Sequence, residues 1–92
     1  MGFLEVKHDL YYQADEALTE GMSRNERYNR ELLQISRILH VYIVQPYRTA
    51  ICIEYLSKHG EGFDMVESFE TEVECYTRFN EISKILKEDK QK

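Results

Sequence analysis

A run of carboxylates in the second half of the chain is the feature best placed to do chemistry. From Glu61 to Thr77 the sequence has six acidic residues and no Lys or Arg, a charge of −6 against −5 for the whole 92-residue chain. The six are Glu61, Asp64, Glu67, Glu70, Glu72 and Glu74. Carboxylates at a helix start complement the helix dipole and cap free amides, which accounts for the last three. Asp64 and Glu67 have no evident partner in the sequence.

Two explanations of this acidic block remain open. Charge runs are usually solvated surface, and that is the simpler one. The other is that carboxylates along a strand and a helix start imitate a row of DNA phosphates and occupy a basic groove. Small acidic chains of this kind resemble phage-borne inhibitors of host nucleic-acid enzymes in size and charge, without a shared motif.

Tyrosine supplies the second set of candidate binding residues. The chain has seven Tyr and no Trp, and tyrosine is enriched at protein interfaces because it combines a ring with a hydroxyl. Three of the seven fall at predicted surface edges. The residues predicted to contact a partner are therefore Glu61, Asp64, Glu67, Glu70, Glu74, Tyr11, Tyr12 and Tyr47.

Nucleophilic chemistry is weakly indicated. If a three-residue loop joins two predicted strands, His40 lies opposite Cys52, and a Cys–His contact is the start of a nucleophile. A two-residue loop instead pairs His40 with Ile53 and removes the contact. Cys52 also lies within an apolar run, where burial raises a thiol pKa and leaves it inert. We predict no catalytic residue and keep a small thiol enzyme, using Cys52 or Cys75, as a remote alternative.

Metal and cofactor chemistry lack a motif. His8, His40 and His59 are scattered, and no pattern of paired cysteines or calcium-loop carboxylates is present. A glycine-rich phosphate loop is absent as well, since Gly60-Glu61-Gly62 places a carboxylate where phosphate needs bare amides. We predict neither a metal nor a cofactor.

Two helices are predicted in the first part of the chain. From Asp9, apolar residues recur with helical spacing up to a terminating glycine, Gly21. Ser23-Arg24-Asn25-Glu26 has the pattern of a capping box, which predicts a second helix running to about Ser36. Its apolar stripe at Tyr28, Leu32, Ile35 and Leu39 is expected to face the core. Residues 1–8 are expected to form an extended arm or a short strand.

A sheet and a third helix are predicted to follow. Residues 40–44 and 49–56 are rich in β-branched and aromatic residues, and Gln45-Pro46-Tyr47 between them is typical of a hairpin turn. A third strand is expected at residues 63–69. Thr71-Glu72-Val73-Glu74 is another capping box, predicting a helix to about Lys87 and a flexible tail over residues 88–92.

The predicted architecture is a single α+β domain spanning residues 1–92. Its order is helix, helix, three antiparallel strands, helix. Both faces of the first hairpin are apolar, whereas a half-exposed sheet alternates apolar and polar residues. Either helices cover both faces or a second subunit covers one, so a homodimer is among the expectations.

Composition limits the function classes. The chain is globular in composition, with 42% hydrophobic and 32% charged residues, and it has no apolar run long enough for a signal peptide or membrane span. A cytoplasmic location is therefore predicted. Its net negative charge disfavours direct binding of nucleic acid. We expect a small acidic, non-catalytic regulator that binds a protein with a basic surface, with the DNA-mimicking inhibitor as the alternative.

Overall fold

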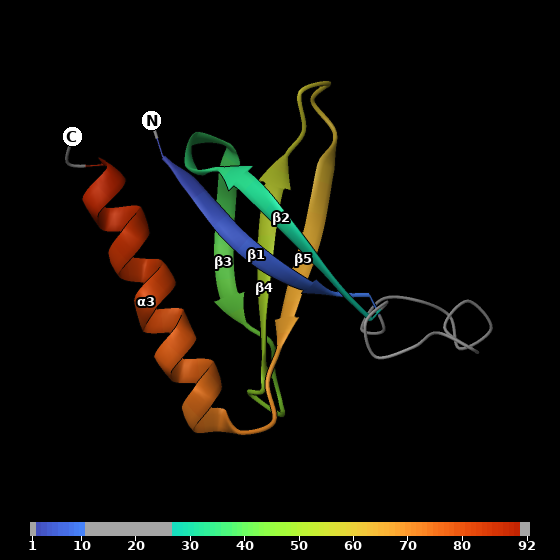
Figure 1. The fold of residues 1–92 in the computed structure, drawn as a ribbon, viewed down its shortest axis with the longest axis vertical. Helices are drawn as coiled ribbons and strands as arrows, with labels where there is room; N and C mark the ends of the chain where they lie inside the picture. Colours follow the sequence, from blue (N-terminus) through green and yellow to red (C-terminus); the bar gives the residue numbers. More distant parts are fainter. Residues whose placement is uncertain (1, 11–26, 91–92) are drawn as a thin grey trace.

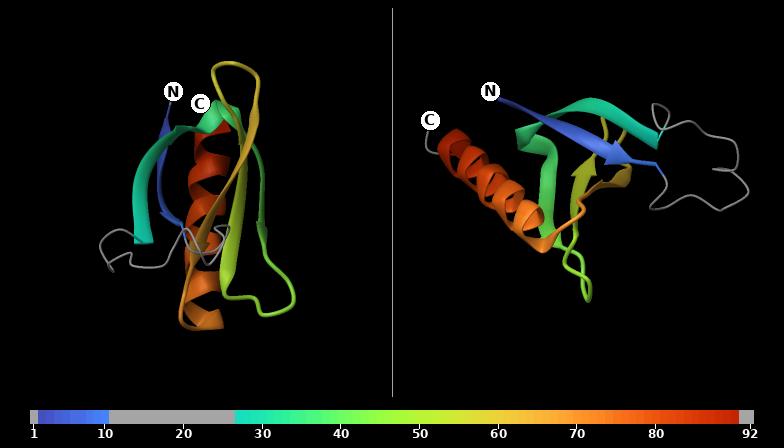
Figure 2. Two further views of the ribbon diagram at one scale, coloured as in Figure 1. Left: turned by 90° about the vertical axis from the view of Figure 1, so that its right-hand side faces the viewer. Right: turned by 60° about the horizontal axis from the view of Figure 1, so that its bottom comes forward.

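The fold is seen in a computed structural model that describes residues 2–10 and 27–90. Its strands form two antiparallel sheets, one of order β1-β2 and one of order β3-β4-β5. The two-stranded sheet crosses one face of the three-stranded sheet, and the long C-terminal helix α3 lies on that same side (Figures 1 and 2). The elements are β1 (Phe3–Asp9), β2 (Tyr28–Gln34), a 3-10 helix η1 (Ile35–Arg37), β3 (Ile38–Ile43), β4 (Ala50–Leu56), β5 (Gly62–Ser68) and α3 (Glu72–Lys90).

Strand β1 has the alternation that makes one side of a sheet apolar. Leu4 and Val6 are buried, while the intervening Glu5 is exposed. In the pairing of β1 with β2, Leu4 lies opposite Leu33, which is also buried. Because side chains alternate along a strand, these residues all point toward the three-stranded sheet.

Strand β4 is the centre of the three-stranded sheet and its most buried strand. Ile51 and Ile53 have no exposed surface and face α3 and the β1–β2 pair. Ala50 and Cys52 point to the opposite side, where they pack with Val66 of β5. This double-sided burial explains why β4 reads as a continuous apolar run rather than an alternating one.

Side chains of β1 and β5 join the two sheets. The backbone N–H of Val66 points away from β4 and donates to Nδ1 of His8 at 2.9 Å. The backbone N–H of Lys7 donates to Oε2 of Glu67 at 3.2 Å. The Ser68 hydroxyl donates to the carboxylate of Asp9, which also accepts two hydrogen bonds from Arg27. The outer edge of β5 is thus covered by polar contacts with β1.

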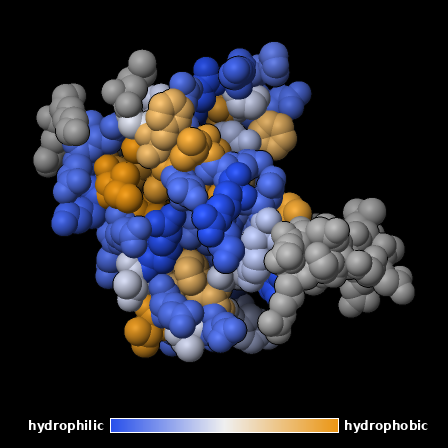
Figure 3. Space-filling model, viewed as in Figure 1, coloured by the Kyte–Doolittle hydropathy of each residue, from blue (hydrophilic) through white to orange (hydrophobic). Residues whose placement is uncertain are grey.

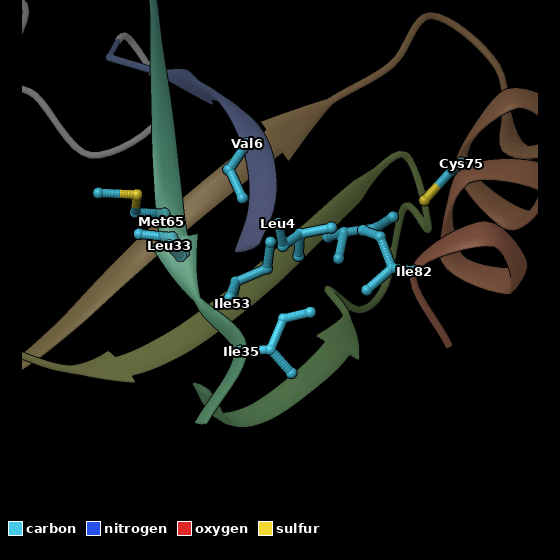
Figure 4. Close-up of a cluster of buried hydrophobic side chains, with 9 residues drawn as sticks. Leu4, Val6, Leu33, Ile35, Ile53, Met65, Cys75 and Ile82 are labelled. Atoms are coloured by element: carbon cyan, nitrogen blue, oxygen red, sulfur yellow. The ribbon is translucent and has the colours of Figure 1, made fainter. Parts of the chain in front are cut away.

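The core fills the space between the two sheets and α3. Figure 4 shows Ile82 and Cys75 reaching from α3 toward side chains contributed by both sheets. Both of these helix residues are fully buried. The buried core residues are Leu4, Val6, Leu33, Ile35, Ile51, Ile53, Met65, Cys75 and Ile82.

The predicted element order is wrong, because the described part of the chain has a β1–β2 strand pair where the second helix was expected. The segment expected to be the second helix forms β2 and η1 instead. The helical stripe would bury Leu32, but in the strand Leu32 is 68% exposed and its neighbour Leu33 is 5% exposed. Pairing with β1 along the whole of β2 overrides the local helical periodicity, because tertiary context outweighs propensity in a short segment. Asp9, where the first helix was expected to begin, ends β1, and the remainder of that helix lies outside the described residues except for Leu10.

The three-stranded antiparallel sheet and the C-terminal helix are confirmed. The cap of α3 is as expected, since the Glu74 backbone N–H donates to Oγ1 of Thr71 at 3.2 Å. The helix continues to Lys90, so residues 88–90, expected in a flexible tail, are helical. Within residues 2–10 and 27–90, none of the helices combines the length and apolar character needed to cross a membrane.

Candidate functional site

Glu67, a predicted contact residue, is held inside the protein. It lies on the core side of β5, opposite Ile51, and is 4% exposed. Arg78 of α3 approaches it with two N–H groups, Nε at 2.8 Å from Oε1 and Nη2 at 3.1 Å from Oε2. These hydrogen bonds with Glu67 are the largest cause of the raised pKa of Arg78. Glu67, which has no evident partner in the sequence, is therefore paired in the fold by an arginine from eleven positions further along.

Arg78 joins three elements through one guanidinium group. Besides Glu67 it donates to Oε1 of Glu81 at 2.6 Å and to the backbone carbonyl of Glu5 in β1 at 2.7 Å. The side chain is 20% exposed, so it occupies the floor of the cleft between β1, β5 and α3. The three carboxylates that line this cleft, Glu5, Glu67 and Glu81, each have an arginine partner. We therefore interpret the cleft as a structural network rather than a ligand site.

The remaining predicted carboxylates divide between the two ends of β5. Glu61 and Asp64 lie at the start of this strand, and Glu70 and Glu74 lie beyond its end, where α3 begins. All four are exposed. A seven-residue strand spans roughly 20 Å, so the two pairs are well separated. With Glu67 buried between them, the acidic block is not a continuous row.

The tyrosines do not gather around these carboxylates. Tyr47 is 81% exposed on the loop between β3 and β4, at the end of the molecule where α3 begins (Figure 1). Tyr11 and Tyr12 lie outside the described residues.

An exposed apolar groove is the surface that the sequence did not reveal. It lies between the β1–β2 pair and the end of β4, has a volume of about 440 Å³, and is bordered by Arg37 and Lys58. Figure 3 shows hydrophobic surface gathered over the start of β1 and the end of β2. Two of the lining side chains are strongly exposed, Phe3 at 58% and Leu32 at 68%. The complete lining is Phe3, Leu32, Leu33, Gln34, Arg37, Tyr55, Leu56, Ser57 and Lys58.

The apolar surface continues beyond the groove. The ring of Tyr55 stacks on that of Phe63 in β5, with centroids 5.6 Å apart, and Phe63 is itself 44% exposed. No carboxylate lines the groove, although the chain as a whole is acidic. A sequence signal existed in Phe3 and Leu32, whose apolar side chains lie on the outward face of β1 and β2, but it could be read only once both segments were known to be strands.

Neither of the two pairings considered for His40 is found. Cys52 lies opposite Tyr42, and His40 lies opposite Glu54, with 3.6 Å between His40 Nδ1 and Glu54 Oε2. The connection between the strands is longer than either loop considered, because Val44 still pairs with Ala50 through a 2.9 Å backbone hydrogen bond. The hydrogen bond with Cys52 is the largest of the effects that raise the pKa of Tyr42 to about 12.

Both cysteines are expected to be unreactive in the folded protein. Cys52 and Cys75 are free and buried, and burial is the main cause of the raised pKa of each thiol. A raised pKa leaves little thiolate at neutral pH, and the thiolate is the reactive form. Labelling with a disulfide reagent at pH 7 should be slow for both thiols and become fast in urea. Rapid modification of Cys52 without unfolding would contradict this and revive the thiol-enzyme alternative.

Metal ligands are not grouped within the described part of the chain. Across residues 2–10 and 27–90, no set of three or more His, Cys, Asp or Glu side chains is arranged to hold an ion. Comparison of the chain with protein-family models, with curated proteins and with solved structures finds no match.

Proposed function

We propose that this chain is a small non-catalytic regulator that binds a protein through the apolar groove. The observation that supports the proposal is the clustering of exposed Phe3 and Leu32 beside Tyr55 and Leu56 around one concave surface. Single exposed apolar residues are ordinary, but a contiguous apolar patch with a polar rim is typical of an interaction site. Aromatic side chains in such a pocket are the residues that most often dominate binding energy.

The groove favours a particular kind of partner segment. Its walls are apolar and its rim carries the cations Arg37 and Lys58 without a carboxylate. The best fit is an apolar segment flanked by acidic residues, since opposite charges at the rim orient a partner and like charges repel it. The nearest carboxylate on the outward face is that of Glu5, which lies opposite Leu32 in the β1–β2 pairing. Arg30 is 3.7 Å from this carboxylate and offsets its charge.

This assignment moves the expected contact away from the acidic block. A partner with a basic surface was expected on the assumption of one acidic face, but Glu67 is internally paired and the exposed carboxylates lie at opposite ends of β5. The DNA-mimic alternative stays a prediction, and no specific feature of the described residues favours it.

Substitution of Leu32 by aspartate tests the groove. Leu32 is 68% exposed, so the fold should be retained, but aspartate is a poor strand residue and would face Glu5 across the β1–β2 pair. We therefore expect the change to cost about 1 kcal/mol of stability. It should weaken capture of a partner from cell lysate about 30-fold, the equivalent of losing a ~2 kcal/mol hot spot. Binding would be measured by titrating the immobilised protein against the captured partner.

Val73→Asp is the matched control for this experiment. Val73 is 76% exposed on α3, and the substitution introduces the same charge away from the groove. The control should bind as the unmodified protein does. If Leu32→Asp and Val73→Asp retain equal, full affinity, the partner does not use the groove and the proposal fails.

A further inference from the structure

The outer edge of β3 presents backbone groups that no described residue satisfies. The hydrogen bond from the Val44 N–H to the Ala50 carbonyl sets the phase of the β3–β4 ladder. Since hydrogen-bonded pairs alternate along an antiparallel ladder, Tyr42 bonds to Cys52 while Val41 and Ile43 direct their N–H and C=O groups outward. Among the described residues, no backbone or side-chain hydrogen bond reaches these outward groups.

Edge strands normally carry features that prevent pairing. The helix α3 borders one face of β3, but the sequence of β3 has few such features. Its sequence, Ile-Leu-His-Val-Tyr-Ile, contains no Lys, Glu, Asp or Pro. A bulge at Leu39 interrupts the regular edge at its start, but residues 40–43 continue without a register shift. The opposite edge of this sheet is closed, because Val66 of β5 donates to His8. The edge of β2 carries charge, including Arg30 and Glu31.

We propose that β3 pairs antiparallel with β3 of a second copy of this chain, around a two-fold axis at Tyr42. In this register Tyr42 faces the same residue of the partner copy, and Val41 faces Ile43. The outward N–H and C=O groups of Val41 and Ile43 then bond to one another across the axis. The two three-stranded sheets become one continuous sheet.

The residue types favour a second copy as the occupant of this edge. Across the axis, aromatic meets aromatic at Tyr42 and β-branched meets β-branched at Val41 and Ile43, which are favourable cross-strand pairs. No charged side chain meets a like charge. The equivalent two-fold through the middle of β2 would place Glu31 against Glu31, which is unfavourable. The dimer edge also leaves the groove residues Phe3 and Leu32 free, so dimerisation and partner binding are separable.

A charge-pair experiment at Tyr42 tests the dimer. Sedimentation equilibrium of the full chain should show a dimer, and Tyr42→Lys or Tyr42→Glu alone should weaken self-association roughly 100-fold, because like charges at an interface cost several kcal/mol. Mixing the two variants should restore a heterodimer, since Lys then faces Glu. Leu32→Asp, in the groove, should dimerise as the unmodified chain does.

Several outcomes would overturn the proposal. These are an unmodified chain that stays monomeric at millimolar concentration, a Tyr42→Lys chain that still dimerises, no rescue on mixing, or a dimer lost in Leu32→Asp. Hydrogen exchange of the unmodified chain gives a test that does not depend on a variant folding. The amides of Val41 and Ile43 should exchange slowly only at concentrations where the dimer forms, whereas the Tyr42 amide, bonded within the monomer, should be slow at both. Equal exchange of Val41 and Ile43 at low and high concentration would contradict the pairing.

Discussion

Replacing Arg78 with methionine is expected to lower the free energy of unfolding by about 3–5 kcal/mol, the usual cost of leaving one member of a buried ion pair without its partner. Glu67 is 6% exposed at its side chain and receives two hydrogen bonds from Arg78. Methionine fills a similar volume but offers no hydrogen-bond donor. The Glu67 carboxylate therefore stays buried, at the same cost of desolvation, but loses the hydrogen bonds and the positive charge that offset this cost. The substitution also removes the hydrogen bond from Arg78 to the Glu5 carbonyl, which links α3 to β1. Urea denaturation followed by circular dichroism would measure the change.

Two further variants isolate the buried pair. Arg30→Met removes the same charge from an exposed pair, in which Arg30 and Glu5 are 3.7 Å apart with side chains 74% and 61% exposed. Pairs of that kind contribute about 0–1 kcal/mol, so this control should be nearly neutral. The double variant Glu67→Gln with Arg78→Met should recover much of the lost stability, because a neutral amide replaces the buried charge and still accepts from the Lys7 N–H. Equal effects of Arg78→Met and Arg30→Met would show that the internal pair is not a stabilising contact.

Truncating Ile82 to alanine is expected to destabilise the protein by about 2–5 kcal/mol. Ile82 is fully buried and is the residue through which the middle of α3 enters the core shared by both sheets. The removed methyl and methylene groups lose their burial and leave a cavity that the surrounding strands cannot fully close. A domain of this size has a thin core and typically ~5–15 kcal/mol of total stability. At about 4–8 °C per kcal/mol, the thermal midpoint should fall by about 8 °C or more.

Val73→Ala provides the comparison for Ile82→Ala. Val73 lies on the same helix but is 76% exposed, so its truncation removes little buried surface. Alanine also has the higher helix propensity, which should make the control neutral or slightly stabilising. A small effect at Ile82 would mean that α3 does not pack against the sheets as Figure 4 shows.

The second half of the fold could be predicted from local sequence, and the first half could not. The strands β3, β4 and β5 are rich in β-branched and aromatic residues and are separated by Pro and Gly turns, so local preference and final structure agree. The Thr71 cap likewise fixes where α3 begins. At residues 28–36 the apolar spacing is helical, yet the segment forms β2 and the start of η1. The choice depends on β1, which lies some twenty residues earlier and supplies the backbone partners of β2.

The candidate sites divide in the same way. The sequence shows where the carboxylates are, but it does not distinguish the buried Glu67 from the exposed Asp64. The partner of Glu67 is Arg78, which lies close to it only because α3 packs on β5. The Cys52–His40 contact considered from the sequence does not form. It depended on the length of one loop, which sets the register of every pair in the β3–β4 ladder. The groove could not be predicted from the sequence, because Phe3, Leu32 and Leu56 belong to three strands that are far apart in the chain and adjacent only in the folded protein.

The sequence by itself therefore determined the features that depend on residues close together in the chain. These are an acidic single α+β chain, a three-stranded antiparallel sheet and a capped C-terminal helix. Only the tertiary structure decided the pairing of β1 with β2, the partner of Glu67, and which apolar side chains remain in contact with solvent. The physical reason is that burial and pairing depend on residues far apart in the chain, whose approach no local periodicity encodes. The acidic run that dominates the sequence proved to be partly internal, and the apolar surface left exposed by the fold is where we place the function.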